Sequence, residues 1–346
     1  MTPVPRAGAA AHVYHEEQPV PAIGPGEALV RARACGICSG DVVPWYIRKK
    51  APLVFGHEPV GEIVAVGAGV EALRPGERVF VHHHAPCFRC RACARGAFVQ
   101  CPTWKQSQLD PGGMAEYFRV PAVNVAGDTL RLPDGVSDAD GALVEPLACV
   151  VKSLARAGSI ADASVLIIGL GVMGQLHILL ARHLGARQIL AADLIASRCA
   201  HAAQLGADVV IDASAADLPA AVREHTDGDG AEVVIVGPAT VAAIEQGIAC
   251  AARGGTVLQF MGTEPGAVLP LATDDFYFRE LRLIPSYSCG PTDTRRALEL
   301  IADGVVGARH VVTHRFALED AAEAYRTAAL DKTAIKTLVC FAGSTE

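Results

Sequence analysis

The sequence predicts an α/β protein that combines a doubly wound parallel sheet with a second, β-rich domain. From about residue 165 onward, short apolar runs alternate with alanine-rich amphipathic segments, which is typical of strands joined by crossover helices. Before about residue 150, glycines and prolines separate short β-branched runs, which indicates a barrel-like domain of short strands. The third observation is a glycine-rich turn directly after the first apolar run of the second part.

The individual elements follow from these patterns in chain order. In the first part we expect strands at 28–32, 61–67, 78–81 and 115–120. In the second part the strands are continuous apolar runs, as expected for a sheet covered on both faces, at 165–168, 188–192, 208–211, 232–236, 256–260 and 281–284. The helices between them are expected at 172–184, 196–205, 216–225 and 241–252. The last stretch predicts helices at 293–302 and 318–329 and a terminal strand at 336–341.

Composition and charge exclude several classes of function. The 346 residues suffice for roughly two domains, and a net charge of -7 without a basic run argues against nucleic acid or an anionic membrane as partner. No apolar run reaches the ~20 residues of a membrane span, and the N-terminus lacks the apolar core of a signal peptide. Eleven cysteines, several of them clustered, favour metal binding in a reducing cytoplasm over disulfides. We therefore expect a cytoplasmic protein.

The glycine-rich turn predicts a dinucleotide site. Gly169 permits the tight turn, Gly171 lets the backbone approach a pyrophosphate, and Gly174 lets the helix pack closely on the sheet. Val172 and Met173 open the helix, whose unpaired N–H groups attract phosphates. The alternative is an ordinary strand-to-helix turn that binds nothing.

An acidic residue predicts which nicotinamide cofactor is used. Asp193 ends the next predicted strand, about 20 residues on, where a carboxylate accepts a hydrogen bond from the ribose 2′-OH. Its charge would repel a 2′-phosphate, so we expect NAD rather than NADP. Arg198 complicates this preference, because an arginine can accommodate the extra phosphate.

Four cysteines in one short segment predict a structural zinc site within a lobe at about residues 86–102. Four thiolates complete a tetrahedral zinc and leave no open position. The alternatives are incidental buried thiols or a redox pair, but the latter needs only one C-x-x-C motif. The residues are Cys87, Cys90, Cys93 and Cys101.

A second, mixed set of ligands predicts a catalytic zinc. Cys35, His57 and Glu58 offer a thiolate, an imidazole and a carboxylate, which leave one position open for a substrate. We interpret the neighbouring Cys38, together with Cys149, as a small core residue. Glu145 is a further ligand in reserve.

At these residues the chain resembles the zinc-containing medium-chain dehydrogenase/reductase family, the alcohol dehydrogenase superfamily, over essentially its whole length. The segment Val144–Leu147 resembles the polyol (sorbitol) and threonine dehydrogenase branch, since classical alcohol dehydrogenases have a cysteine ligand at the position of Glu145. The other motifs that carry the resemblance are Gly56–Gly61, Val66–Gly67, Pro75–Val79, the four-cysteine lobe, Gly112–Tyr117 and the glycine-rich turn.

The resemblance implies a two-domain architecture. A discontinuous GroES-like catalytic domain is expected at 1–157 and 288–346, and a Rossmann NAD-binding domain at 158–287, with zinc and nicotinamide between them. Asp41 matches a carboxylate that orients His57, and Tyr287 loosely matches a position near the nicotinamide. The resemblance also implies a homotetramer or a homodimer.

The expected reaction is the oxidation of a secondary alcohol (a polyol, cyclitol or amino alcohol) to the ketone, with hydride transfer to NAD. Two zinc ions per chain, one catalytic and one structural, are expected. One alternative is a primary-alcohol or aldehyde oxidoreductase of the same superfamily. An alternative from another class is an inactive nicotinamide-binding or structural protein, which would have no need of complete ligand sets.

Charge and side-chain patterns leave three points open. Zinc with one thiolate, one carboxylate and a neutral imidazole is formally neutral, so a second carboxylate from Glu145 would oppose alkoxide formation. We therefore expect Glu145 to bind the zinc only in some states or through water.

Gly40 stands where relatives place a serine or threonine that relays the alcohol proton, so the proton must leave through water or Glu145. His82–His84 resemble a metal cluster, but successive strand residues point to opposite faces, which favours a packing role.

Overall fold

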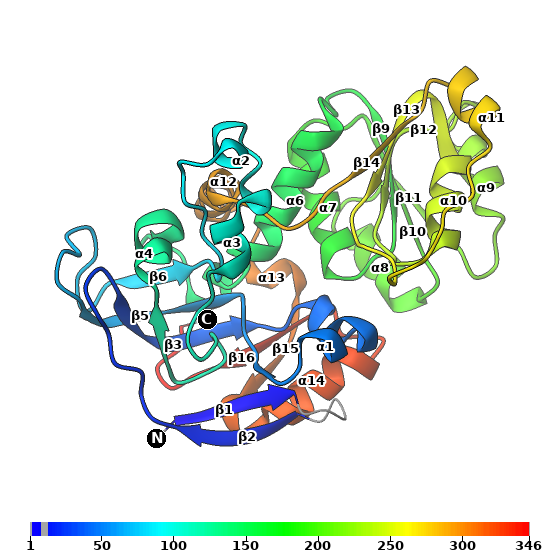
Figure 1. The fold of residues 1–346 in the computed structure, drawn as a ribbon. Helices are drawn as coiled ribbons and strands as arrows, with labels where there is room; N and C mark the ends of the chain where they lie inside the picture. The colour runs from blue at the N-terminus through cyan, green and yellow to red at the C-terminus, as the bar shows by residue number, and fades with distance from the viewer. Residues whose placement is uncertain (1, 8–12, 346) are drawn as a thin grey trace. The chain divides into compact units, whose positions relative to one another are not determined.

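The computed structural model describes residues 2–7 as backbone, and residues 13–345. The chain divides into two compact units (Figure 1). Unit 1 runs to Ala148 and resumes at Cys289, and unit 2 runs from Cys149 to Ser288. Helix α6 (Val144–Ala157) crosses the first boundary, which therefore lies nine residues before the predicted one at residue 157. Among the described helices, none combines the length and apolar character needed to cross a membrane.

Unit 2 contains the predicted doubly wound sheet. Its strand order is β11-β10-β9-β12-β13-β14, and all neighbours in it are parallel. The chain thus builds outward from β9 to β11, then returns to the other side of β9 at β12, which creates a switch point at the carboxyl ends of β9 and β12. The strands are β9 (Ser164–Ile168), β10 (Gln188–Asp193), β11 (Val209–Asp212), β12 (Ala231–Val236), β13 (Ala251–Gln259) and β14 (Arg282–Pro285).

The helices of unit 2 connect these strands, as the alternating pattern predicts. Helix α7 buries Val172, Leu176 and Leu180, which recur every four residues on one face. All five residues of β9 are buried, which explains why the run is apolar without alternation. The helices are α7 (Val172–His183), α8 (Ala196–Gln204), α9 (Leu218–Glu224), α10 (Val241–Cys250) and α11 (Thr273–Phe278).

Unit 1 contains a seven-stranded sheet in the order β15-β16-β3-β5-β6-β8, with β7 also paired to β3. Strand β16 comes from the end of the chain and pairs antiparallel with β3, so the C-terminal segment completes the sheet begun near residue 28. The strands are β3 (Ala28–Gly36), β5 (Pro59–Val66), β6 (Arg78–Val81), β7 (Tyr117–Val120), β8 (Thr129–Arg131), β15 (Val312–Ala317) and β16 (Lys336–Cys340).

A second, small sheet in unit 1 lies outside the sequence prediction. It has the order β2-β1-β4, with β1 at Thr2–Ala7, β2 at Val13–Gln18 and β4 at Leu53–Val54. The helices of the unit are short apart from two near the end of the chain: α1 (Pro44–Lys50), α2 (Arg91–Ala94), α3 (Pro102–Gln106), α4 (Ala122–Asp128), α5 (Asp138–Gly141), α12 (Pro291–Ala302), α13 (Ala308–Val311), α14 (Ala321–Leu330), and the 3-10 turns η1 (Ser39–Val42), η2 (Phe98–Gln100) and η3 (Leu318–Asp320).

Candidate active site and metal centres

A cysteine, a histidine and a glutamate of unit 1 come together as a mixed-donor group. Cys38, His57 and Glu58 each offer one ligand atom, and these atoms all lie within 4.8 Å of one another. Cys38 lies in the turn after β3 and accepts a hydrogen bond from the Gly40 N–H at 3.3 Å, while the other two residues directly precede β5. We call this group the Cys38 cluster.

The structure corrects the choice of cysteine, because Cys35 is not part of this group. Cys35 lies within β3, paired with Pro59 on β5 and Val339 on β16, and its side chain is fully buried in the hydrophobic core. Burial raises the pKa of the Cys35 thiol, which disfavours the thiolate that a metal requires. The strand continues through residue 36, beyond the predicted end at residue 32, so the next cysteine, Cys38, is the first that the turn can present.

A buried cation that sequence reasoning missed faces the cluster. The Lys336 ammonium on β16 donates to the Glu58 carboxylate, and both side chains are 1% exposed. Burial opposes the charged lysine, but the Glu58 carboxylate outweighs it and raises the pKa of Lys336. A Cβ on Gly36 would lie 1.8 Å from a Glu58 carboxylate oxygen, so only glycine leaves room for the pair.

Asp41 lies beside the histidine of the cluster, as its expected orienting role requires. Its Oδ2 is 3.5 Å from His57 Nδ1, and its side chain is 4% exposed. Burial disfavours the His57 imidazolium, but the negative charges of Asp41 and Cys38 outweigh it and hold the pKa of His57 well above its usual range. Burial likewise raises the pKa of Asp41. The imidazole therefore lies in an electronegative pocket suited to a cation.

Glu145 belongs to a second group of possible ligands, which we call the Cys289 cluster. It consists of His82, Glu145 and Cys289, all buried, with one ligand atom each within 4.8 Å of the others. The His82 ring places Nε2 3.6 Å from Cys289 Sγ and Nδ1 2.7 Å from Asp128 Oδ2. Glu145 is nevertheless close enough for its charge to raise the pKa of His57.

The three successive histidines do not act as one group. His82 belongs to the Cys289 cluster, whereas the His83 ring centroid lies 5.0 Å from that of His57. His84 Nδ1 lies 2.5 Å from the Ser107 carbonyl oxygen, and its ring packs on Trp104 with centroids 4.2 Å apart. The three histidines follow β6, which ends at Val81, so the alternation expected of strand residues does not apply to them, and the partners of His82 were not predicted.

The four cysteines of the predicted lobe converge. One ligand atom from each of the four lies within 4.8 Å of all the others, and none forms a disulfide. The Sγ atoms are 3.5 Å apart for Cys90 and Cys93 and 3.6 Å apart for Cys87 and Cys101. Zinc–sulfur bonds of about 2.3 Å at tetrahedral angles put two sulfurs about 3.8 Å apart. The spacing therefore fits a closed tetrahedral site.

The glycine-rich turn of unit 2 has the geometry that the motif predicts. Gly169 follows β9 with φ +88°, a conformation that favours glycine. A Cβ on Gly174 would lie 2.1 Å from the Gly169 carbonyl oxygen, so its absence permits close packing of α7. A Cβ on Gly171 would meet nothing nearer than Arg198 at 3.9 Å, so the backbone there is open. Val172 and Met173 form the first turn of α7.

Asp193, at the end of β10, is bound to this turn. Its Oδ2 accepts from the Leu170 N–H at 2.6 Å and its Oδ1 from the Ile195 N–H at 2.9 Å. Arg198 on α8 reaches toward Gly171. Tyr287 is 54% exposed, and its carbonyl oxygen accepts from Lys152 Nζ at 2.6 Å. The carboxylate and the guanidinium thus both lie near the turn, where they have opposite effects on a phosphate.

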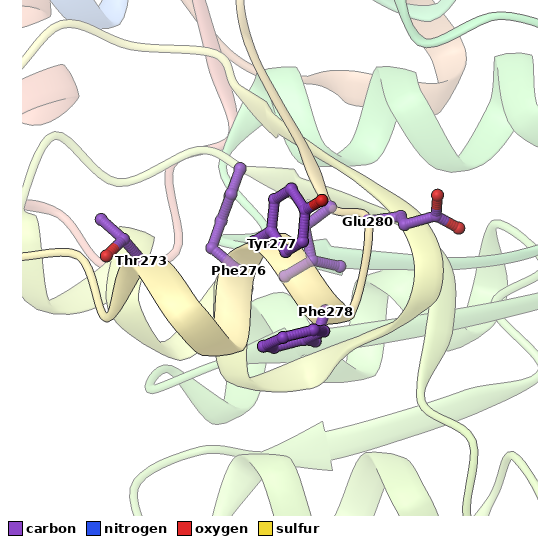
Figure 2. Close-up of a pocket in the computed structure, with 6 residues that line it drawn as sticks. Thr273, Phe276, Tyr277, Phe278 and Glu280 are labelled. Carbon is purple, nitrogen blue, oxygen red and sulfur yellow. The ribbon is translucent and has the colours of Figure 1, made fainter.

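A separate hollow in unit 2 contains none of the predicted site residues. It measures about 650 Å³ and lies along α11 (Figure 2). Tyr277 and Phe278 on its wall are about three-quarters exposed. The hollow offers apolar surface, and its lining residues include the Glu280 carboxylate but neither a cysteine nor a histidine. Its lining residues are Thr273, Phe276, Tyr277, Phe278, Glu280 and Leu281.

Comparison with known proteins extends over both units. The family model "Alcohol dehydrogenase GroES-like domain" matches residues 24–133, and the model "Zinc-binding dehydrogenase" matches residues 172–303. Sorbitol dehydrogenase of Ovis aries is 33% identical over 323 residues, which cover 90% of this chain and 89% of that protein. L-threonine 3-dehydrogenase of Symbiobacterium thermophilum is 37% identical over 263 residues, which cover 74% of this chain and 73% of that protein.

A solved structure shows the same fold. It is that of a candidate zinc-binding dehydrogenase from Sinorhizobium meliloti 1021, bound to NADP. It superimposes with a TM-score of 0.88 at 28% sequence identity, and the match covers 98% of this chain and 99% of that one.

Proposed function

Since the chain belongs to the zinc-containing medium-chain dehydrogenases of the alcohol and polyol type, we propose that it oxidises a secondary alcohol to a ketone with NAD as hydride acceptor. The class of reaction follows from the family: the protein is an oxidoreductase that acts on a small alcohol with zinc and a nicotinamide cofactor. The observation that carries this proposal is the Cys38 cluster, in which a half-buried thiol, a half-buried imidazole and a buried carboxylate come together on the β-rich unit.

The donor set of the Cys38 cluster fits a catalytic zinc. One sulfur, one nitrogen and one oxygen ligand leave a fourth position open, and a zinc ion there supplies the Lewis acidity that lowers the pKa of an alcohol. We assign Cys38, His57 and Glu58 as its ligands. Asp41 Oδ2 lies 3.5 Å from His57 Nδ1, and we propose that this carboxylate would orient the imidazole when an ion is bound.

Lys336 changes the charge balance that the sequence suggested. With the thiolate, the Glu58 carboxylate and a neutral imidazole, a zinc site is formally neutral, and the Lys336 ammonium adds one positive charge. A further carboxylate in the vicinity would therefore restore neutrality rather than make the site anionic. Because the Glu145 carboxylate groups with His82 and Cys289 and not with the ligands of the Cys38 cluster, we propose that it acts on the Cys38 cluster through its charge and not as a simultaneous ligand. A complex with an alkoxide-like inhibitor in which both carboxylates bind the ion directly would contradict this.

The proton of the alcohol needs a path that this chain's own hydroxyl groups do not supply. Gly40 has no side chain and Ser39 is exposed. A Cβ on Gly40 would lie 3.6 Å from both Cys38 Sγ and the Tyr46 ring, which is ordinary van der Waals contact. We propose that water carries the proton outward from this side of His57.

The preference for NAD rests on Asp193. Its carboxylate is fixed by the N–H of Leu170 in the glycine-rich turn and the N–H of Ile195 just after β10, where it would accept from a ribose hydroxyl and repel a 2′-phosphate. Comparison of kcat/KM for NAD⁺ and NADP⁺ tests the preference. Clear selectivity for NADP⁺ would show that Arg198 dominates instead.

The substrate class is tested by a screen of polyols, cyclitols, sugar phosphates and threonine, with NADH formation as the readout. We expect turnover on secondary alcohols in preference to primary ones, and at least one zinc per chain that a chelator removes together with activity. A protein that oxidises no alcohol in its zinc-loaded form would refute the proposal. Sedimentation analysis of the same preparation tests the expected homotetramer or homodimer.

A further inference from the structure

We propose that His82, Glu145 and Cys289 form a metal site of their own, which binds a divalent cation such as zinc. This Cys289 cluster shares no residue with the four-cysteine cluster or with the Cys38 cluster. It therefore adds a third candidate metal position to unit 1, built from residues that the proposed reaction does not use as ligands.

The spacing of the ligand atoms fits a tetrahedral ion. Zinc–sulfur and zinc–nitrogen bonds of about 2.3 Å and 2.0–2.1 Å, at a tetrahedral angle, put the two ligand atoms about 3.5 Å apart. The Cys289 Sγ and His82 Nε2 atoms are 3.6 Å apart. Glu145 contributes a carboxylate oxygen within 4.8 Å of both. A small movement of one carboxylate therefore completes three corners of a coordination shell.

The histidine is already held as metal-bound histidines are held. Its Nδ1 lies 2.7 Å from Asp128 Oδ2, and Asp128 Oδ1 accepts from the Thr294 hydroxyl at 2.5 Å. With the Nδ1 proton donated to Asp128, the Nε2 lone pair faces the sulfur. The Asn124 amide donates to the His82 carbonyl oxygen at 2.9 Å and further fixes the residue. A carboxylate behind the imidazole is the common arrangement of zinc-binding histidines.

Charge and burial favour a cation in this position. His82, Asp128 and Cys289 are fully buried, and Glu145 is 6% exposed. Ionisation of the thiol and of both carboxylates would give this buried group up to three negative charges, and buried charges are typically paired or coordinate a metal. A divalent ion would compensate for the thiolate and one carboxylate together. The mixture of sulfur, nitrogen and oxygen donors suits zinc better than magnesium or calcium.

Occupancy of this site would also affect the neighbouring one. The charge of Glu145 acts on both His57 and His82. An ion bound by the Cys289 cluster would hold Glu145 there and screen its charge from the Cys38 cluster. Metal binding at the Cys289 cluster would thus make the electrostatic potential around the proposed catalytic ion less negative.

Metal counting on folded, zinc-reconstituted protein tests the proposal. We expect about three zinc equivalents per chain in the wild type and a loss of about one in Cys289→Ser, because serine is a poor zinc ligand. Cys250→Ser is the matched control, since Cys250 is also fully buried but lies in the core of unit 2. A wild type whose zinc content is the same as that of Cys289→Ser would overturn the proposal and leave only a thiol–imidazole hydrogen bond.

The same series separates this inference from the proposed function. Cys38→Ser removes the other mixed-donor site, so it should lose a different equivalent, and the double variant should lose both. Loss of one zinc equivalent in Cys289→Ser but not in Cys38→Ser would support the Cys289 site and refute the catalytic assignment. Loss of one equivalent in Cys38→Ser but not in Cys289→Ser would support the catalytic assignment and refute the Cys289 site.

A measurement on the wild type covers the case in which Cys289→Ser fails to fold. Crystals of the zinc-loaded protein should show anomalous scattering from zinc between His82, Glu145 and Cys289. An anomalous map with a zinc peak at the four-cysteine site but no peak between His82, Glu145 and Cys289 would overturn the proposal.

Discussion

The glycine-rich turn of unit 2 and the Cys38 cluster of unit 1 represent two ways of building a binding site. The turn lies within six consecutive residues, Gly169 to Gly174, and acts through backbone shape. The Cys38 cluster draws on the end of β3, the start of β5 and, through Lys336, the end of the chain. The motif alone predicted the first site. In the second site, strand register determines which cysteine meets His57 and Glu58 and where the buried Lys336 lies.

The largest expected effect distinguishes the two cysteines at the end of β3. Cys38→Ser should lose about one zinc and lower kcat/KM by about 10⁴-fold, because Lewis acidity contributes several kcal/mol to the barrier. Cys35→Ser should keep its metal and most of its turnover, at a cost of about 1–3 kcal/mol in stability for a hydroxyl buried in the core. Zinc analysis and steady-state kinetics check both. Loss of zinc and of turnover in Cys35→Ser, with both kept in Cys38→Ser, would show that Cys35 is the ligand.

The next effect tests the buried ion pair. Lys336→Met leaves the Glu58 carboxylate buried without its partner, which should lower the free energy of unfolding of the zinc-free protein by about 3–5 kcal/mol. Zinc should restore part of this loss, since the ion then faces the same carboxylate. Chemical denaturation with and without zinc measures the difference. An equal loss in both states would argue against Glu58 as a ligand.

Two alanine substitutions test the backbone site of unit 2. Gly174→Ala puts a Cβ against the Gly169 carbonyl oxygen, so it should cost about 1–3 kcal/mol of stability as well as cofactor affinity. Gly171→Ala meets no close protein atom and should weaken NADH binding while stability is kept. Thermal unfolding and fluorescence titration with NADH separate the two. Equal stability of both variants would mean that α7 packs less closely than described.

The smallest effect concerns acid stability of unit 2. Burial lowers the pKa of His177 to about 4, and its Nε2 lies 2.7 Å from the Ser153 hydroxyl. As pH falls below about 6.5 the unfolded state gains a proton that the native state does not, so stability falls until about pH 4. His177→Gln should remove about 2 kcal/mol of this dependence between pH 6.5 and 5. Unfolding curves of both proteins at these pH values provide the check, and parallel curves would exclude a titrating His177.

Particular elements show where prediction from sequence stops. The predicted strand at 78–81 coincides with β6, and the helix at 172–184 ends within one residue of α7, because local apolar spacing governs both. The strand at 28–32 continues to Gly36 as β3, where its partners β5 and β16 extend it. That extension moves Cys35 into the core and leaves Cys38 at the turn.

The amino-acid sequence by itself determined the alternating architecture of unit 2, the shape of its glycine-rich turn and the grouping of the four cysteines, because the residues involved are near neighbours in the chain. Only the tertiary structure decided that Cys38 meets His57, that Lys336 faces Glu58 and that Cys289 meets His82. These pairs are separated by 19, 278 and 207 positions, respectively. Such contacts depend on the register between distant strands, which no local pattern of residues records.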